Sequence, residues 1–208
     1  MNAHAAAYVV SRNVMNPWFG RVEFLVGLIA MIAIRIPYGK RCAELEVVES
    51  QKGRREIALL ALMWIATTIL PLISIVTPLL SFADYPLHPI QFSLGTACLL
   101  SGLWLFRRSH VDLGDNWSIS LEIRTQHKLI DHGVYARVRH PMYTSIFLQA
   151  IAQALLLPNW VAGPSCLLAF ILMFALRVST EERMMLKQFG EDYALYMGRS
   201  KRLVPGVW

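Results

Sequence analysis

The chain has 208 residues, of which 55% are hydrophobic and 16% are charged, and its mean hydropathy is +0.44. Charged residues are scarce compared with the roughly one quarter of a soluble domain, and the apolar residues fall in long blocks, which excludes an ordinary soluble protein and indicates an integral membrane protein. The net charge of +6 comes from Lys and Arg clustered beside the apolar blocks, which membrane topology and anionic lipid explain better than nucleic acid.

The apolar runs predict five membrane spans, in chain order residues 22–36, 57–80, 90–106, 142–157 and 160–176. The first run is short, so its span can begin at Trp18, and Arg35 near its end can snorkel to the interface. Pro37 and the residues after it are expected to break this helix. The last two runs are separated only by Pro158 and Asn159, which predicts a tight helical hairpin.

Prolines and glycines inside the runs predict local features of the spans. Pro71 and Pro78 predict a kink in the second span, and Gly95 and Gly102 predict close helix packing in the third. After the last span, residues 180–197 are expected to form a separate helix that begins with Thr180 as its N-cap.

The polar segments predict the orientation of the chain. Residues 40–56, 107–140 and 177–208 each carry several Lys and Arg, whereas the turn at residues 81–89 carries none. The positive-inside rule therefore places these three segments in the cytoplasm, although Arg12 and Arg21 fit this orientation less well. The strongly charged segment 40–56 is interpreted as a solvated connection without a site.

These patterns predict an all-α integral membrane protein with about five transmembrane helices and a cytoplasmic pocket. Residues 1–106 form a membrane region with three spans. Residues 107–208 form a catalytic region that comprises a polar loop, the helical hairpin and a C-terminal helix. The first twenty residues lack the pattern of a secretory signal, and Cys42, Cys98 and Cys166 have a spacing that suits neither a metal site nor a disulfide framework.

Candidate chemistry concentrates in residues 127–143, the most polar and most histidine-rich stretch. The hairpin begins where this stretch ends, so His140 is expected close to Arg177 and Glu181. Arg177 and Glu181 stand four residues apart and can instead simply pair with each other, or Arg177 can anchor the helix end at the headgroups.

Several common sites are disfavoured. His127, His132 and His140 follow no helical metal-binding spacing, so no metal site is predicted. Nucleophile-elbow, dinucleotide and P-loop fingerprints are missing from the sequence, and no alternating strand–helix pattern supports a Rossmann-type domain.

The run LGDNWS…HKLIDHGVYARVRHPMY, followed by two short spans, R-x-x-x-E-E and FGEDYALYMGRSKRLVPG, resembles the isoprenylcysteine carboxyl methyltransferase family, especially its small prokaryotic members. The resemblance covers the chain from Leu113 to its C-terminus. The R-H-P element alone is shared more widely, with phospholipid N-methyltransferases, thiol methyltransferases and sterol reductases.

The resemblance implies a pocket for S-adenosylmethionine formed by the polar loop, the hairpin and the C-terminal segment. The implied cofactor-binding residues are His127, Lys128, Leu129, Ile130, Tyr135, His140, Pro141, Met142, Tyr143 and Glu181. Arg177 is the implied catalytic residue, near the carboxylate of the acceptor.

The chemistry of these residue types fits the implied roles. A carboxylate acceptor is already ionised at neutral pH and needs no general base, so the protein has to align the reactants and exclude water. The implied acceptor is a prenylated cysteine or a related lipophilic acid, reached from the bilayer of a bacterial inner membrane. Methylation of a phospholipid amine or a small thiol, a nicotinamide-dependent reductase and a non-catalytic membrane subunit remain as alternatives.

Overall fold

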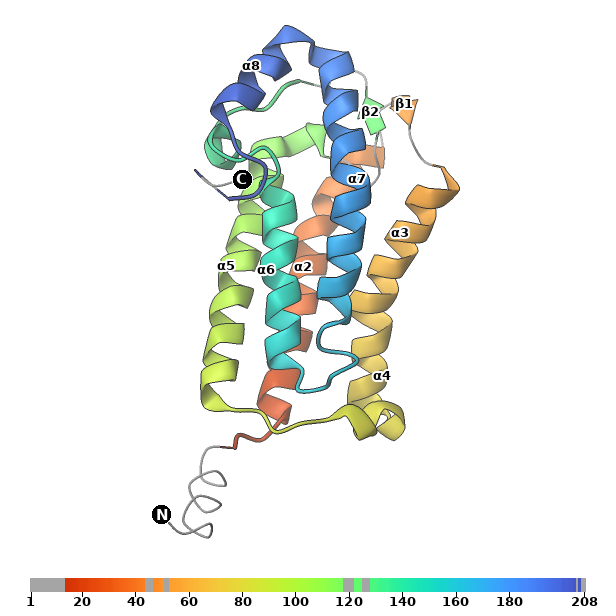
Figure 1. The fold of residues 1–208 in the computed structure, drawn as a ribbon, viewed down its shortest axis with the longest axis vertical. Helices are drawn as coiled ribbons and strands as arrows, with labels where there is room; N and C mark the ends of the chain where they lie inside the picture. Colours follow the sequence, from red (N-terminus) through yellow and green to blue (C-terminus); the bar gives the residue numbers. More distant parts are fainter. Residues whose placement is uncertain are drawn as a thin grey trace.

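In the computed structural model, which describes residues 14–43, 47–50, 53–117, 122–124, 128–204 and 206, the chain forms a bundle of long helices lying side by side (Figure 1). The helices are α2 (Trp18–Ala43), α3 (Arg54–Trp64), α4 (Leu70–Val76), α5 (Pro89–Leu113), α6 (Pro141–Leu156), α7 (Ser165–Phe189) and α8 (Glu191–Arg199). The helical architecture predicted from the apolar runs is confirmed. The additional element is a small antiparallel sheet at one end of the bundle, formed by β1 (Val47–Ser50) and β2 (Glu122–Arg124).

The first helix is longer than predicted. It passes through Pro37 and ends at Ala43, so the predicted break at Pro37 is wrong. Proline removes one intrahelical hydrogen bond, but its fixed φ is compatible with a helix, and neighbouring helices allow such an interruption in an apolar setting. The extension adds Tyr38 and the residues up to Ala43 to the helix, whereas Arg35 already lay within the predicted run.

The predicted irregularity in the second apolar run takes the form of a π-helical turn. This turn, η1 (Ile65–Ile69), joins α3 to α4 just before Pro71. The carbonyl of Ala66 accepts hydrogen bonds from Gln153 Nε2 at 3.0 Å and from Ser165 Oγ at 2.8 Å. The widened turn therefore ties the second run to α6 and to the start of α7, which satisfies buried polar atoms within the bundle.

Close packing of α5 on α6 depends on the glycines that the sequence singled out. Gly95 and Gly102 are both buried in α5, and a Cβ at Gly102 would lie 3.2 Å from the carbonyl oxygen of Ser145. The structure adds a third contact of this kind, which was not predicted. A Cβ at Gly20 in α2 would lie only 2.0 Å from the carbonyl oxygen of Leu156. Small residues at these positions allow the backbones of α2, α5 and α6 to approach closely.

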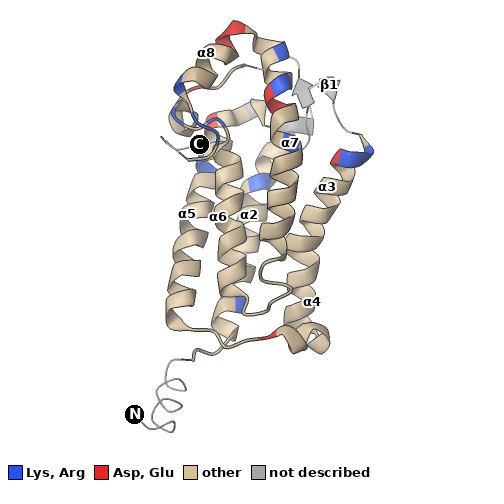
Figure 2. Cartoon of the chain, viewed as in Figure 1, with Lys and Arg blue, Asp and Glu red and all other residues tan. Residues whose placement is uncertain are grey.

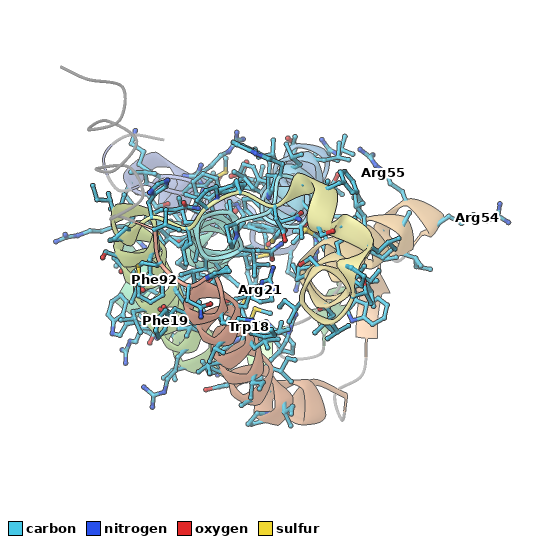
Figure 3. All side chains as sticks on the ribbon, turned by 90° about the horizontal axis from the view of Figure 1, so that it is seen from below. Trp18, Phe19, Arg21, Arg54, Arg55 and Phe92 are labelled. Atoms are coloured by element: carbon cyan, nitrogen blue, oxygen red, sulfur yellow. The ribbon has the colours of Figure 1, made fainter. Side chains whose placement is uncertain are left out.

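The connection between α6 and α7 lies at the end of the bundle opposite the sheet. Asn159 organises it, because its Oδ1 accepts from the backbone N–H of Ala162 at 2.8 Å and its Nδ2 donates to Asp84 Oδ1 at 2.7 Å. Asp84 also pairs with Arg21 at 3.2 Å, and Arg21 stacks on the Trp18 ring in the first turn of α2 (Figure 3). Arg21, which fitted the predicted orientation poorly, is therefore paired with an acidic residue.

The C-terminal half of α7 differs from the prediction. The helix continues without a break from Ser165 to Phe189, so Thr180 lies inside it and is not an N-cap. The hydroxyl of Thr180 instead accepts from Arg183 Nη2 at 3.1 Å. A separate short helix begins only after Gly190, whose φ of 54° ends α7. Continuity of α7 places Arg177 and Glu181 on successive turns of one rigid helix.

Charge and hydropathy divide the bundle along its length. Most Lys, Arg, Asp and Glu residues lie at the end that carries α8 and the start of α3, and the body of the bundle has few of them (Figure 2). Two helical stretches are long and apolar enough to cross a membrane, Arg54–Val76 with mean hydropathy 2.3 and Pro89–Leu113 with mean hydropathy 1.3. Large apolar side chains, such as Trp104 at 66% exposure, cover the outside of the body.

Candidate active site

A cavity of about 520 Å³ opens among α2, α3, α6 and α7 and extends from the charged end into the apolar body. Most of the residues predicted to form the site line this one cavity: Lys128, Leu129, Ile130, Tyr135, His140, Met142, Tyr143, Arg177 and Glu181. Pro141 is buried in the first turn of α6 and is not part of the lining. His127 lies outside the described residues. The fold thus brings together two segments that the sequence places far apart, and the roles of these residues stay predictions.

Arg177 does not anchor α7 at the surface of the bundle. Its guanidinium is buried, and its Nη2 lies 3.3 Å from Oε1 of Glu56, which is also buried in the first turn of α3. The interpretation of residues 40–56 as a solvated connection without a site is therefore wrong at Glu56. A buried ion pair of this kind loses much stability when one partner is removed, because the other charge then remains uncompensated.

Glu181 is the carboxylate that faces the cavity. Tyr143 donates its hydroxyl hydrogen to Glu181 Oε2 at 2.7 Å, and His140 Nδ1 lies 3.7 Å from Glu181 Oε1. The Glu181 side chain keeps 31% of its surface exposed, so one face of the carboxylate can still accept hydrogen bonds from a ligand. A carboxylate beside an aromatic ring is suited to hydroxyl or ammonium groups.

Glu182, next in the chain, faces away from the cavity into a cluster of cations. Arg202 donates to both of its oxygens, with Nη2 at 2.7 Å, and Arg139 Nε donates to Oε1 at 3.1 Å. His140 Nε2 lies 3.5 Å from the same carboxylate. Burial by itself raises the pKa of Glu182, but the hydrogen bonds and charges of His140 and Arg202 outweigh burial and lower the pKa to about 2.

The C-terminal segment lies along the polar loop as a strap, defined here as residues 200–204. The strap runs parallel to the polar loop: the N–H of Arg139 donates to the carbonyl of Lys201 at 2.7 Å, and the N–H of His140 donates to the carbonyl of Arg202 at 3.0 Å. The Tyr196 hydroxyl in α8 donates to the carbonyl of Tyr135 at 2.6 Å. The C-terminus therefore fixes the backbone of the loop that presents Tyr135 and His140.

The polar loop is also held from α5. Asp112 Oδ2 accepts from the N–H of Val134 at 2.8 Å, and Asn116 Oδ1 accepts from the N–H of Lys128 at 2.8 Å. Gly133 has φ of 60°, and a Cβ there would lie 2.1 Å from Asp112 Oδ2, so glycine is required at this turn. Tyr135 is buried behind the turn, and burial followed by the charge of Glu181 raises its pKa well above the usual range. Its phenol therefore stays protonated.

Trp117 forms the wall of the cavity opposite α7. Its ring is almost fully buried, its Nε1 lies 3.2 Å from Met142 Sδ, and the Arg35 guanidinium lies 5.2 Å above the ring centre. The ring of His110 packs against it at 5.0 Å, and His110 Nδ1 lies 2.8 Å from the carbonyl oxygen of Phe106. Arg35 therefore lies over the Trp117 ring at the wall of the cavity, and the expectation that it snorkels to the interface stays a prediction.

Some residues that line the cavity were not identified from the sequence: Arg35, Trp117, Tyr193 and Tyr196. They share one property, which is that their partners in the site are distant in the sequence. Trp117 is part of the LGDNWS motif, and this motif was the only local sequence feature that pointed to Trp117 as a site residue. Among the described residues, no group of three or more His, Cys, Asp or Glu side chains is arranged to hold a metal ion. The cavity instead combines cations, one accessible carboxylate and aromatic rings.

Comparisons with known proteins agree with the resemblance. Residues 94–187 match the model of the isoprenylcysteine carboxyl methyltransferase family. The matched residues include most of α5, the polar loop, α6 and most of α7, and thus Tyr135, His140, Tyr143, Arg177 and Glu181. The Arg35 and Glu56 side chains come from helices that precede the matched stretch.

Protein-S-isoprenylcysteine O-methyltransferases are similar to about half of the chain. A protein-S-isoprenylcysteine O-methyltransferase of Schizosaccharomyces pombe is 31% identical over 54% of this chain and 48% of its own length. The corresponding protein of Tribolium castaneum is 32% identical over 55% of this chain and 42% of its own length. The chain thus spans about half the length of these curated relatives.

A solved structure of a eukaryotic intramembrane Ras methyltransferase of the isoprenylcysteine carboxyl type is similar to a larger part of the chain. It superimposes with a TM-score of 0.51 at 25% sequence identity, over 77% of this chain and 55% of that structure. The similarity in fold therefore covers more of the chain than the residues that the family model matches.

Proposed function

We propose that this chain transfers a methyl group from S-adenosylmethionine to the carboxylate of a lipophilic acceptor, and that a prenylated cysteine is the acceptor that fits best. The observation that carries the proposal is the single cavity, which joins a polar end with an accessible carboxylate to an apolar body with a buried arginine. The names of the relatives, which are protein-S-isoprenylcysteine O-methyltransferases, support the same reaction.

The residues at the polar end fit the methyl donor. Its hydroxyl and ammonium groups need acceptors, and Glu181 offers a carboxylate with an exposed face beside the Tyr143 hydroxyl. Its purine ring and sulfonium need aromatic or soft surfaces, and Trp117 and Met142 provide them on the opposite wall. When bound, this cofactor supplies an electrophilic methyl group attached to a positively charged sulfur.

The apolar part of the cavity fits a lipophilic acceptor. Leu28, Leu60 and Met63 line it, and they come from α2 and α3, which carry exposed apolar side chains on their outer faces. Arg177 lies where the apolar and polar parts meet, so it can hold one carboxylate oxygen and leave the other free to react. The apolar lining around this junction limits the access of water to the reacting groups.

We also propose that the bundle spans the membrane five times, with the charged end and the strap in the cytoplasm of a bacterial cell. The spans are residues 22–36, 57–80, 90–106, 142–157 and 160–176, and the charged end visible in Figure 2 is the side rich in Lys and Arg. In this orientation the water-soluble donor enters from the cytoplasm, whereas the acceptor enters from the bilayer. The region before residue 107 then contributes Arg35 and Glu56 to the site.

A second candidate is methylation of an amine or a thiol, such as a phospholipid amine. Such an acceptor must lose a proton, and His140 is the feature that favours it, because its ring nitrogens lie 3.7 Å from Glu181 and 3.5 Å from Glu182. A carboxylate acceptor makes no use of such a base.

The decisive experiment measures methyl transfer from labelled S-adenosylmethionine to a panel of acceptors: a farnesylcysteine analogue, phosphatidylethanolamine and a small thiol. We expect the farnesylcysteine analogue to be the preferred acceptor. Preference for the phospholipid or the thiol would support the second candidate function, in which the acceptor is an amine or a thiol and not a carboxylate. Failure to bind the donor would refute a methyltransferase.

The role of Glu181 is tested by the affinity for the donor alone. We expect Glu181→Ala to weaken S-adenosylmethionine binding by about tenfold or more, because hydrogen bonds to a charged partner contribute about 1.5–3 kcal/mol. Isothermal calorimetry on the purified protein measures this affinity. Unchanged binding would remove Glu181 from the cofactor site.

The role of Arg177 needs a variant that keeps the fold intact, because Arg177→Ala alone leaves the Glu56 carboxylate buried without this ion pair. The double variant Arg177→Gln with Glu56→Gln removes both charges together and should recover most of the stability lost in Arg177→Gln. We expect it to bind the donor normally but to lose acceptor turnover. Equal losses of donor affinity and turnover would contradict a role at the acceptor.

A further inference from the structure

Arg35 is a partly buried cation of the cavity, and its charge is not compensated within the described residues. It comes from α2, before the stretch that matches the family model, and it lines the cavity. No described carboxylate forms an ion pair with it, and its Nε is buried without a hydrogen-bond partner. The contact that the structure gives it is the stack on the Trp117 ring at 5.2 Å.

The other arginines of the cavity are already engaged with carboxylates. Arg177 pairs with Glu56 at 3.3 Å, and Arg139 pairs with Glu182 at 3.1 Å. Arg35 and Arg177 also repel each other electrostatically. A buried charge without a counter-ion is costly, so this part of the cavity favours a negatively charged group supplied by a ligand.

The Arg35 guanidinium lies over the Trp117 ring, with its Cζ 5.2 Å from the ring centre. A guanidinium that lies over an aromatic ring uses its face for the stack, whereas its N–H groups point outward in its own plane. The Trp117 ring is itself fixed, because its Nε1 lies against Met142 Sδ at 3.2 Å and His110 packs against it at 5.0 Å. A rigid platform therefore holds a cationic fork at the wall of the cavity, and such a fork matches a carboxylate.

We propose that Arg35 binds the carboxylate of the lipophilic acceptor and thereby makes the cavity selective for an anionic acceptor. The inference rests on the proposed function, since it assigns the acceptor group of the same cavity. Arg177, whose charge Glu56 already offsets, then orients the carboxylate rather than supplying the attracting charge. Selectivity for the acceptor thus comes from the N-terminal helix, and the residues that match the family supply the donor side.

The test is a binding experiment without the methyl donor, so it stands apart from catalysis. The probes are N-acetyl-S-farnesylcysteine and its methyl ester, which differ only in the charge of the carboxyl group. We expect the full-length protein in detergent micelles to bind the acid at least about tenfold more tightly than the ester, as a charge-assisted hydrogen bond requires. In Arg35→Gln this ratio should fall to about one, with the ester affinity unchanged.

A matched control is Arg107→Gln, which removes the same charge from an exposed position of α5 outside the cavity lining and should keep the full ratio. If Arg35→Gln does not fold, Arg35→Lys serves instead and should lower the ratio at least about threefold, since lysine lacks the planar fork. An unchanged ratio in either Arg35 variant overturns the proposal.

Two further outcomes also decide against it. An equal loss of acid and ester affinity would mean that Arg35 only shapes the Trp117 wall. Phosphatidate serves as a third probe in the same binding experiment. If Arg35→Gln loses phosphatidate binding but keeps the acid-to-ester ratio, Arg35 binds a phospholipid headgroup instead. Selective acid binding by a protein that transfers no methyl group would uphold the role of Arg35 and refute the proposed function alone.

Discussion

Neutralising Glu182 should weaken the protein at neutral pH and remove a specific part of its acid sensitivity. The carboxylate is only 5% exposed and accepts from Arg139 and Arg202, so Glu182→Gln leaves two guanidiniums without their counter-ion. Breaking a buried pair costs about 3–5 kcal/mol. The loosened strap should also raise the exposure of the polar loop that presents His140.

The lowered pKa of Glu182 leads to a similar value for its contribution to the free energy of unfolding. The pKa of Glu182 falls from 4.5 to about 2, because the hydrogen bonds and charges of His140 and Arg202 outweigh the opposing effect of burial. A difference of this size corresponds to about 3 kcal/mol of stability. Since the folded-state pKa lies below the unfolded-state value, this contribution is complete above about pH 4.5 and is lost as the pH falls toward 2.

The assay is equilibrium or thermal unfolding in detergent micelles between pH 2 and pH 7, for the native chain and for Glu182→Gln. We expect the variant to be less stable by about 3 kcal/mol at pH 7 and to converge on the native chain at the acid end. Glu191→Gln is the control, because Glu191 is an exposed carboxylate in the first turn of α8 and its loss should cost less than about 1 kcal/mol. Equal stability of the native chain and Glu182→Gln at pH 7, or parallel pH profiles, would refute the reasoning.

Two other changes test the packing and the cavity. Gly20→Ala should destabilise the protein by about 1–3 kcal/mol, since its Cβ would meet the Leu156 carbonyl at 2.0 Å, whereas Gly198→Ala has open space and should be tolerated; unfolding midpoints that do not differ would contradict the close approach of α2 and α6. Tyr143→Phe should weaken donor binding by several-fold to about tenfold in calorimetry, because it removes the 2.7 Å hydrogen bond that orients Glu181; an unchanged affinity would show that this orientation is not needed.

Features that depend on local patterns could be predicted from the amino-acid sequence. Long apolar runs must become helices that satisfy their own backbone hydrogen bonds, so the bundle and the approximate positions of its helices followed from composition. The short connection around Asn159 forced α6 and α7 to be neighbours, which brought the stretch ending at Tyr143 beside Arg177 and Glu181. Gly95 and Gly102 marked the close contact of α5 with α6 for the same local reason.

The burial and the contacts of the charged residues depend on how the helices pack against one another. Glu56 stands in a strongly charged segment that looks solvated, yet α3 begins beside α7 and buries it against Arg177 at 3.3 Å. Arg35 lies over the ring of Trp117, a residue that is distant in the sequence. The energy of a buried charge depends on partners that are distant in sequence, so local pattern cannot reveal it. The residues proposed to select the acceptor are therefore those that the fold, and not the sequence, identifies.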